Sequence, residues 1–205
     1  MKRHIPNILT IARLVLTVVM LGCLVMMAQS IRNPLQGLSL QWLGATAFVS
    51  FVVAAVTDYF DGMLARRWQV TSMMGVILDP IADKVLVCGA ILGLLGVNIP
   101  GVLIPGAIIL FREFAVSALR EVLAPRGVKL PVTFLAKTKT TLQLVALGGF
   151  LGIVAATAWP KGPDFTTIMP YLTATKWLFW IAALITAWTG MEYALAARKA
   201  LKAAP

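Results

Sequence analysis

The chain has 205 residues, of which 60% are hydrophobic and 13% charged, and its 18 basic and 8 acidic residues give a formal net charge of +10. A soluble domain of this length has too small an interior for so much apolar surface, so the composition excludes an ordinary soluble protein and predicts an integral membrane protein. The basic residues are not interleaved with a polar, aromatic-bearing soluble domain, so we expect anionic lipids and phosphorylated substrates as partners, and not nucleic acid.

Six apolar runs follow one another along the chain, each close to the roughly 20 residues that span the hydrocarbon core of a membrane. Turn-forming residues such as Asn33-Pro34, Asn98 and Pro100 separate consecutive runs. No stretch resembles a separate soluble domain. The pattern predicts an all-α integral membrane protein, a bundle of six transmembrane helices that forms a single domain over residues 1–205. The runs cover residues 8–28, 42–60, 75–97, 101–122, 138–158 and 168–195.

Lysines and arginines are distributed unevenly between the two ends of such helices. One side would hold only Arg32 and Lys161, with Lys176 near a helix end. Because basic connections stay on the cytoplasmic side, the other side, which carries both termini, is predicted to be cytoplasmic. Its basic residues are Lys2, Arg3, Arg66, Arg67, Arg126, Lys129, Lys137, Lys139, Arg198, Lys199 and Lys202.

Four of the eight acidic residues lie where the second run ends and the third begins: Asp58, Asp61, Asp79 and Asp83. A carboxylate at the centre of a membrane helix costs roughly 2.5 to 3.5 kcal/mol on insertion scales, so four together require cations. Spacings of three and four residues place each pair on one helical face, and antiparallel packing brings the two faces together at matching heights. Oxygen-only ligands favour Mg²⁺ or Mn²⁺, so we predict a cage for one or two such ions.

Two alternatives to a catalytic metal site remain open for these aspartates. They could cap helices or pair with Arg66 and Arg67. A divalent-cation transporter would also need membrane carboxylates, but it predicts ligands near the midplane on repeat-related, interrupted helices. Here the carboxylates lie toward one face, and the sequence has no detectable repeat.

The aspartate segment resembles the signature of the CDP-alcohol phosphotransferase family, Asp-x2-Asp-Gly-x2-Ala-Arg-x8-Gly-x3-Asp-x3-Asp, at every fixed position. The resemblance implies transfer of a substituted phosphoryl group from a CDP-linked lipid such as CDP-diacylglycerol to an alcohol, with release of CMP. It also implies that the first three aspartates hold the metal ions and that Asp83 completes the site and acts as the general base. The matched positions are Asp58, Asp61, Gly62, Ala65, Arg66, Gly75, Asp79 and Asp83.

Small residues and one arginine accompany the carboxylates within this signature. Gly62, Ala65 and Gly75 leave room for a ligand, although such residues also serve helix packing in membranes. The forked guanidinium of Arg66 suits a phosphate of the CDP group. We therefore expect these four residues to bind CDP.

The first helix adds a polar stripe to the predicted nucleotide pocket. Asn7, Thr10 and Arg13 recur at one-turn spacing, so they lie on one face and are also expected to bind CDP. Alternatively, Asn7 and Thr10 cap the helix and Arg13 extends its charge toward the membrane surface.

A second basic set, Arg112, Arg120, Lys137 and Lys139, flanks the connection between the fourth and fifth helices. Arg112 stands within an apolar run, where a charge is costly unless it faces a polar cavity. We predict that this set binds a phosphate of the acceptor. The alternatives are internal pairs, Arg112 with Glu113 or Arg120 with Glu121, and extension of the charge toward the interface.

An acceptor with its own phosphate explains the second basic set, and glycerol 3-phosphate and inositol phosphate both fit. Segments 5–13, 112–121 and 137–143 resemble the bacterial branch of the family that uses glycerol 3-phosphate; the same chemistry with inositol phosphate or serine is the alternative. This resemblance implies a multi-pass protein of the bacterial cytoplasmic membrane, with its active site facing the cytoplasm. A homodimer is plausible for the family, but no residue pattern indicates one.

Overall fold

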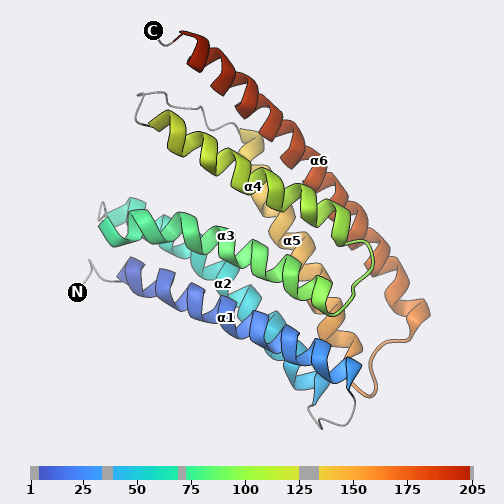
Figure 1. Ribbon diagram of the computed structural model, residues 1–205. Helices are drawn as coiled ribbons and strands as arrows, with labels where there is room; N and C mark the ends of the chain where they lie inside the picture. Colours follow the sequence, from blue (N-terminus) through green and yellow to red (C-terminus); the bar gives the residue numbers. More distant parts are fainter. Residues whose placement is uncertain (1–4, 34–38, 69–72, 125–133, 204–205) are drawn as a thin grey trace. The chain divides into compact units, whose positions relative to one another are not determined.

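The computed structural model describes the backbone of residues 5–33, 39–68, 73–124 and 134–203, and the side chains of residues 7–33, 39–58, 78, 80–124 and 138–199. All regular elements within these ranges are helices, which confirms the predicted all-α fold of six helices (Figure 1). The helices are α1 (Ile5–Arg32), α2 (Leu40–Trp68), α3 (Met73–Gly96), α4 (Leu103–Leu123), α5 (Phe134–Thr157) and α6 (Phe165–Ala203).

Four segments of these helices are long and apolar enough to cross a membrane by length and composition: Asn7–Arg32, Leu40–Asp58, Thr138–Thr157 and Phe165–Lys199. These segments confirm the prediction that the chain is a membrane protein. Among the described residues α3 and α4 do not meet the same criterion, and α4 carries four charged side chains, at 112, 113, 120 and 121. That all six helices cross the membrane stays a prediction.

The chain divides into two compact units. The first consists of Met1–Pro100 and Leu147–Thr173, and so contains α1, α2 and α3 with the end of α5 and the start of α6. The second consists of Gly101–Ala146 and Ala174–Pro205, and contains α4 with the remaining parts of α5 and α6.

In the first unit α1 packs against both α2 and α3 (Figure 1). Glycines on α3 allow the close approach to α1. A Cβ atom added at Gly93 would overlap the Leu24 side chain and lie 3.1 Å from its Cβ, and one added at Gly89 would lie 3.3 Å from Cγ2 of Thr17. This is the small-residue packing typical of membrane helices, where backbones gain van der Waals contact by approaching closely.

Replacement of Gly93 by leucine is expected to destabilise the first unit. The added side chain has no space beside Leu24, which is fully buried, and overpacking of this kind costs about 1 to 3 kcal/mol, or about 5 °C in the melting temperature. Thermal unfolding of the purified protein in detergent measures the effect.

Gly22→Leu is the matched control. Gly22 lies on α1, and nothing lies within 4 Å of a Cβ atom added at this position. Equal melting temperatures for the two variants would contradict the α1–α3 packing.

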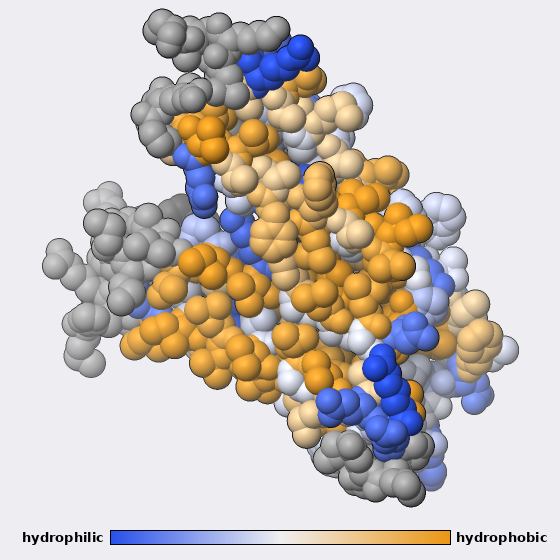
Figure 2. Space-filling model, in the orientation of Figure 1, coloured by the Kyte–Doolittle hydropathy of each residue, from blue (hydrophilic) through white to orange (hydrophobic). Residues whose placement is uncertain are grey.

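The distribution of polar and apolar side chains on α1 is the reverse of that on a surface helix of a soluble protein. Its polar residues Thr10, Arg13 and Thr17 are almost fully buried. Large apolar side chains face outward instead, and Ile8, Ile11, Val15 and Val18 are each more than half exposed. Figure 2 shows apolar side chains over much of the visible surface of each unit. Such a surface is stable in lipid, and the inward polar stripe therefore needs partners inside the unit.

Candidate functional site

One buried arginine on α1 connects two of the signature carboxylates. Nη1 of Arg13 lies 2.7 Å from Oδ1 of Asp58 on α2 and 2.7 Å from Oδ1 of Asp83 on α3, to which it donates a hydrogen bond. The Arg13 side chain is fully buried, whereas those of Asp58 and Asp83 are 39% and 52% exposed. A single internal cation thus holds two carboxylates that remain accessible.

The order of the helices explains this convergence. Because α3 begins at Met73, soon after α2 ends at Trp68, Asp58 near the end of α2 and Asp83 in the first half of α3 reach the same atom. The two Oδ1 atoms therefore lie at one level across α2 and α3. The hydroxyl of Thr17, one turn beyond Arg13 on α1, donates a 2.8 Å hydrogen bond to the Arg13 carbonyl oxygen, so this buried hydroxyl has a hydrogen-bond partner within the helix.

The alternative roles of the first-helix residues, helix capping and extension to the membrane surface, do not fit the structure. Since α1 begins at Ile5, Asn7 and Thr10 lie inside the helix and do not cap it. Thr10 is fully buried, and Asn7 is partly exposed. Arg13 does not extend to the membrane surface, because its charge is buried against Asp58 and Asp83.

The remaining signature positions lie in the predicted helices, but their side chains fall outside the described residues. Asp61, Gly62, Ala65 and Arg66 belong to α2, and Gly75 and Asp79 to α3. Within the part of the chain whose side chains are described, no group of three or more potential metal ligands occurs. The four-carboxylate cage and the CDP pocket therefore stay predictions.

Asp58 and Asp83 nevertheless fit a divalent-cation site in chemistry and in charge. Their oxygen atoms come together from two helices, and carboxylate oxygens are the ligands that Mg²⁺ and Mn²⁺ prefer. The Arg13 guanidinium supplies one positive charge, while the four aspartates of this segment carry four negative charges. Arg13 alone does not balance them, and metal ions would reduce the remaining cost of the carboxylates.

A second polar cluster lies in the second unit, where side chains from three helices meet. Glu113 of α4 pairs with Nη1 of Arg112 at 3.1 Å and with the ammonium group of Lys139 on α5. Nη2 of Arg112 also donates to Oγ1 of Thr189 on α6 at 3.3 Å. Arg112 and Lys139 are both more than nine-tenths buried, so this network lies inside the unit.

Arg120 joins the same cluster through an aromatic side chain. Its Nη2 donates to the hydroxyl of Tyr193 on α6 at 3.2 Å, and its Cζ lies 5.2 Å from the centroid of the Tyr193 ring. Cζ of Arg112 lies 5.5 Å from the same centroid. Both guanidinium groups are thus within the roughly 6 Å at which an aromatic ring attracts a cation.

Among the side chains that the structure describes, the three cations of this cluster face one carboxylate. Arg112 pairs with Glu113, as one of the alternatives anticipated, but Lys139 shares that carboxylate and Arg120 contacts Tyr193 instead of Glu121. Arg112, Arg120 and Lys139 against Glu113 leave a formal excess of two positive charges. Excess charge among apolar helices is costly, and a phosphate, which accepts several charge-assisted hydrogen bonds from guanidinium groups, would relieve it. Lys137 lies in α5, with its side chain outside the described residues.

Sequence reasoning missed the contribution of α6 to this cluster. Thr186, Thr189 and Tyr193 are buried and follow one another at spacings of three and four residues, which places them on one helical face. Thr186 accepts a 2.7 Å hydrogen bond from Nε2 of Gln143 on α5. The signal that could have revealed them is the one-turn polar spacing inside the last apolar run.

Gly190 of α6 makes room for the Arg112 side chain. A Cβ atom at this position would lie 2.7 Å from Cγ of Arg112, closer than real Cβ contacts allow. Arg112 and Gly190 also line an apolar groove of about 560 Å³ between α4 and α6. The absence of a side chain at Gly190 therefore leaves the space that the Arg112 side chain occupies.

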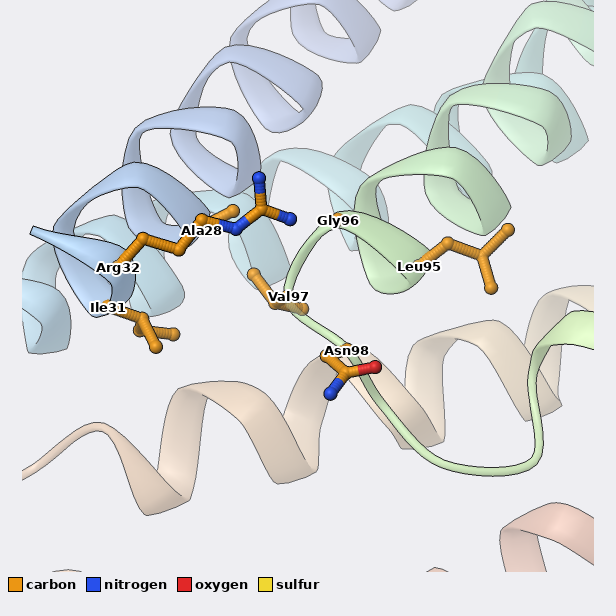
Figure 3. Close-up of a pocket in the computed structure, with 7 residues that line it drawn as sticks. All are labelled: Ala28, Ile31, Arg32, Leu95, Gly96, Val97 and Asn98. Atoms are coloured by element: carbon orange, nitrogen blue, oxygen red, sulfur yellow. The ribbon is translucent and has the colours of Figure 1, made fainter.

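Another pocket, of about 380 Å³, lies at the opposite end of α1 from the carboxylates. Its lining residues come from the ends of α1 and α3, with the Arg32 side chain extending toward α3: Ala28, Ile31, Arg32, Leu95, Gly96, Val97 and Asn98 (Figure 3). Arg13 and Arg32 are separated by 19 residues of helix, which corresponds to about 28 Å along the axis. This pocket is therefore separate from the aspartate site.

Comparison with known proteins agrees with the aspartate signature. A sequence model of a family described as CDP-alcohol phosphatidyltransferase matches residues 3–188. Three relatives share the name CDP-diacylglycerol–glycerol-3-phosphate 3-phosphatidyltransferase. The protein from Cereibacter sphaeroides is 45% identical over 150 residues, 72% of this chain and 62% of the relative. The protein from Rickettsia bellii is 39% identical over 196 residues, 96% of each chain. The protein from Escherichia coli K12 is 38% identical over 164 residues, 78% of this chain and 83% of the relative.

Proposed function

The chain belongs to the CDP-alcohol phosphatidyltransferase family, and from this membership we propose that it transfers the phosphatidyl group of CDP-diacylglycerol to glycerol 3-phosphate. The products are phosphatidylglycerophosphate and CMP. The relatives that carry the name of this reaction support the proposal. The observation that carries the choice of acceptor is the cluster of three cations, of which Arg112 and Lys139 are buried, with one carboxylate among the described side chains, because it complements an acceptor that has its own phosphate.

We assign the aspartates to the metal-dependent part of the reaction. Asp58, Asp61, Asp79 and Asp83 would hold one or two Mg²⁺ or Mn²⁺ ions. Such ions, when bound, neutralise charge on the diphosphate of the donor and on the departing CMP. The CDP group would be bound by the signature and first-helix residues Gly62, Ala65, Arg66, Gly75, Asn7, Thr10 and Arg13.

Asp83 is the proposed general base. The acceptor hydroxyl oxygen forms a bond to the β-phosphorus of the donor, the one next to the diacylglycerol, while the bond from that phosphorus to the oxygen of CMP breaks. The hydroxyl proton passes to the Asp83 carboxylate, a role that contributes typically about 10² to 10⁴ in rate. Arg13 orients this carboxylate through its 2.7 Å contact and keeps Asp58 and Asp83 together.

The acceptor phosphate is assigned to Arg112, Arg120, Lys137 and Lys139. Guanidinium forks provide directed hydrogen bonds to phosphate oxygens, and Lys139 adds a compact charge. Glu113 ties Lys139 to Arg112, so the acidic residue organises the cations while the cluster stays positive.

The basic residues also support a location in the bacterial cytoplasmic membrane, with both termini and the active site facing the cytoplasm. The bacterial source of the relatives agrees with this location. A homodimer is a separate possibility for a member of this family, and the molecular mass of the protein in detergent tests it.

The proposed function is tested by CMP release from CDP-diacylglycerol. Purified protein with Mg²⁺ or Mn²⁺ receives glycerol 3-phosphate, inositol phosphate or serine in separate reactions. We expect CMP release with glycerol 3-phosphate. Release only with inositol phosphate or serine would overturn the acceptor assignment, and no release with any acceptor would overturn the proposed chemistry.

Removal of divalent cations is expected to abolish activity. Four neighbouring carboxylates would repel one another without bound cations, so a chelator in excess should stop CMP release and added Mg²⁺ or Mn²⁺ should restore it. Full activity after chelation would contradict the metal site.

Gly190→Ala is expected to weaken acceptor binding. The new methyl group displaces Arg112, which should raise KM for glycerol 3-phosphate by about tenfold, the equivalent of one hydrogen bond to a charged group. Steady-state kinetics at saturating CDP-diacylglycerol measures this change. Gly22→Ala, in open space, serves as the control, and an unchanged KM in both variants would contradict the role of Gly190.

A further inference from the structure

We infer that Tyr193 is a positioning residue that holds Arg112 and Arg120 together as a binding site for the acceptor phosphate. This inference rests on the proposed function and assigns a task to a residue of α6 outside the aspartate signature and the basic set. Its basis is a single ring in contact with two guanidinium groups, one at 5.5 Å and the other at 5.2 Å.

Tyr193 offsets the repulsion between the two positively charged side chains. Arg112, which is buried, and Arg120, which is exposed, carry like charges and contact the same ring, so they repel each other. The negative face of an aromatic ring attracts each cation. A second carboxylate at this position would also hold the two arginines, but it would cancel charge that the phosphate needs. The tyrosine ring holds both side chains and leaves the excess positive charge in place.

The remaining contacts fix each guanidinium separately. Arg112 is held by Glu113 and Thr189, and Arg120 by the Tyr193 hydroxyl at 3.2 Å. Tyr193 itself is only 4% exposed, so its ring has little freedom to move. Among the described side chains, Nε of Arg112 is a buried nitrogen without a hydrogen-bond partner, which leaves one directed donor for an anion.

The test compares three variants by steady-state kinetics with both substrates. Tyr193→Leu removes the ring, Tyr193→Phe removes only the hydroxyl, and Tyr171→Leu is the control because Tyr171 on the same helix is 64% exposed. Inorganic phosphate, tested as a competitor of glycerol 3-phosphate, reports on the phosphate site alone.

We expect Tyr193→Leu to raise both KM for glycerol 3-phosphate and the inhibition constant of phosphate by about tenfold, since two cation–ring contacts are lost. KM for CDP-diacylglycerol should change by less than about twofold, because the donor does not use this cluster. Tyr193→Phe should raise the acceptor KM by about threefold, the effect of one hydrogen bond. Tyr171→Leu should resemble the wild type.

Three results would overturn the inference: an unchanged acceptor KM in Tyr193→Leu, an equal change in the KM of both substrates, or equal effects of Tyr193→Phe and Tyr193→Leu. If Tyr193→Leu does not fold, Tyr193→Phe decides the question, because it keeps the packing and must still raise the acceptor KM alone. Failure of the proposed function is recognised separately, by a wild-type protein that releases no CMP with glycerol 3-phosphate.

Discussion

Asp83→Asn is expected to lower kcat for CMP release by about 10² to 10⁴, because an amide cannot accept the hydroxyl proton. Asparagine has nearly the same shape as aspartate, so the packing of α3 against α1 should persist. The binding of glycerol 3-phosphate should also persist, since Asp83 is not part of the cationic cluster. Initial rates at saturating concentrations of both substrates measure the loss.

A magnesium titration separates the two roles proposed for Asp83. Loss of a metal ligand alone would be recovered at high Mg²⁺, whereas loss of the base would not. Asp164→Asn is the control, because Asp164 is an exposed aspartate where α6 begins. A variant Asp83→Asn that retains full turnover would exclude Asp83 from the chemistry.

Arg112→Gln is expected to raise KM for glycerol 3-phosphate by about 10², because it removes a charged fork from the acceptor site and breaks the hydrogen bonds that Arg112 donates to Glu113 and Thr189. It should leave KM for CDP-diacylglycerol nearly unchanged. Kinetics with each substrate varied in turn measures the change.

The variant is accompanied by two controls. Arg198→Gln removes an exposed charge from α6 and should have no effect on either KM. The melting temperature of Arg112→Gln reports whether the fold persists, and we expect that it does because Lys139 and Glu113 still form a pair. An unchanged acceptor KM in a folded Arg112→Gln protein would exclude this cluster from acceptor binding.

Most of the fold was predictable from the sequence because membrane helices are encoded by length and apolar composition. The six apolar runs correspond to α1 to α6, with helix ends that differ by at most eight residues. The largest differences, of eight residues, are at the ends of α2 and α6, where polar residues follow the apolar run but the helix continues, to Trp68 and to Ala203. Apolar content predicts the part of a helix that lies in lipid and does not detect polar turns beyond it.

Side-chain partners were less predictable, because they depend on which helices meet. The one-turn spacing of Thr10 and Arg13 indicated a polar stripe, but nothing in it showed that Arg13 bridges Asp58 and Asp83. Likewise Arg112 and Lys139 could be grouped from their places along the chain. The role of Tyr193 requires α6 to lie against α4, a long-range contact that no local pattern specifies.

In the proposed mechanism the carboxylates perform the chemistry, and the cluster of Arg112, Arg120 and Lys139 recognises the acceptor. Two-substrate kinetics on Asp83→Asn and Arg112→Gln under the same conditions measures both roles. We expect Asp83→Asn to have a lower kcat with little change in the acceptor KM, and Arg112→Gln to have a higher acceptor KM with little change in the donor KM. If both variants changed the same parameter to the same extent, or if Arg112→Gln altered only the donor KM, this division of roles would be contradicted.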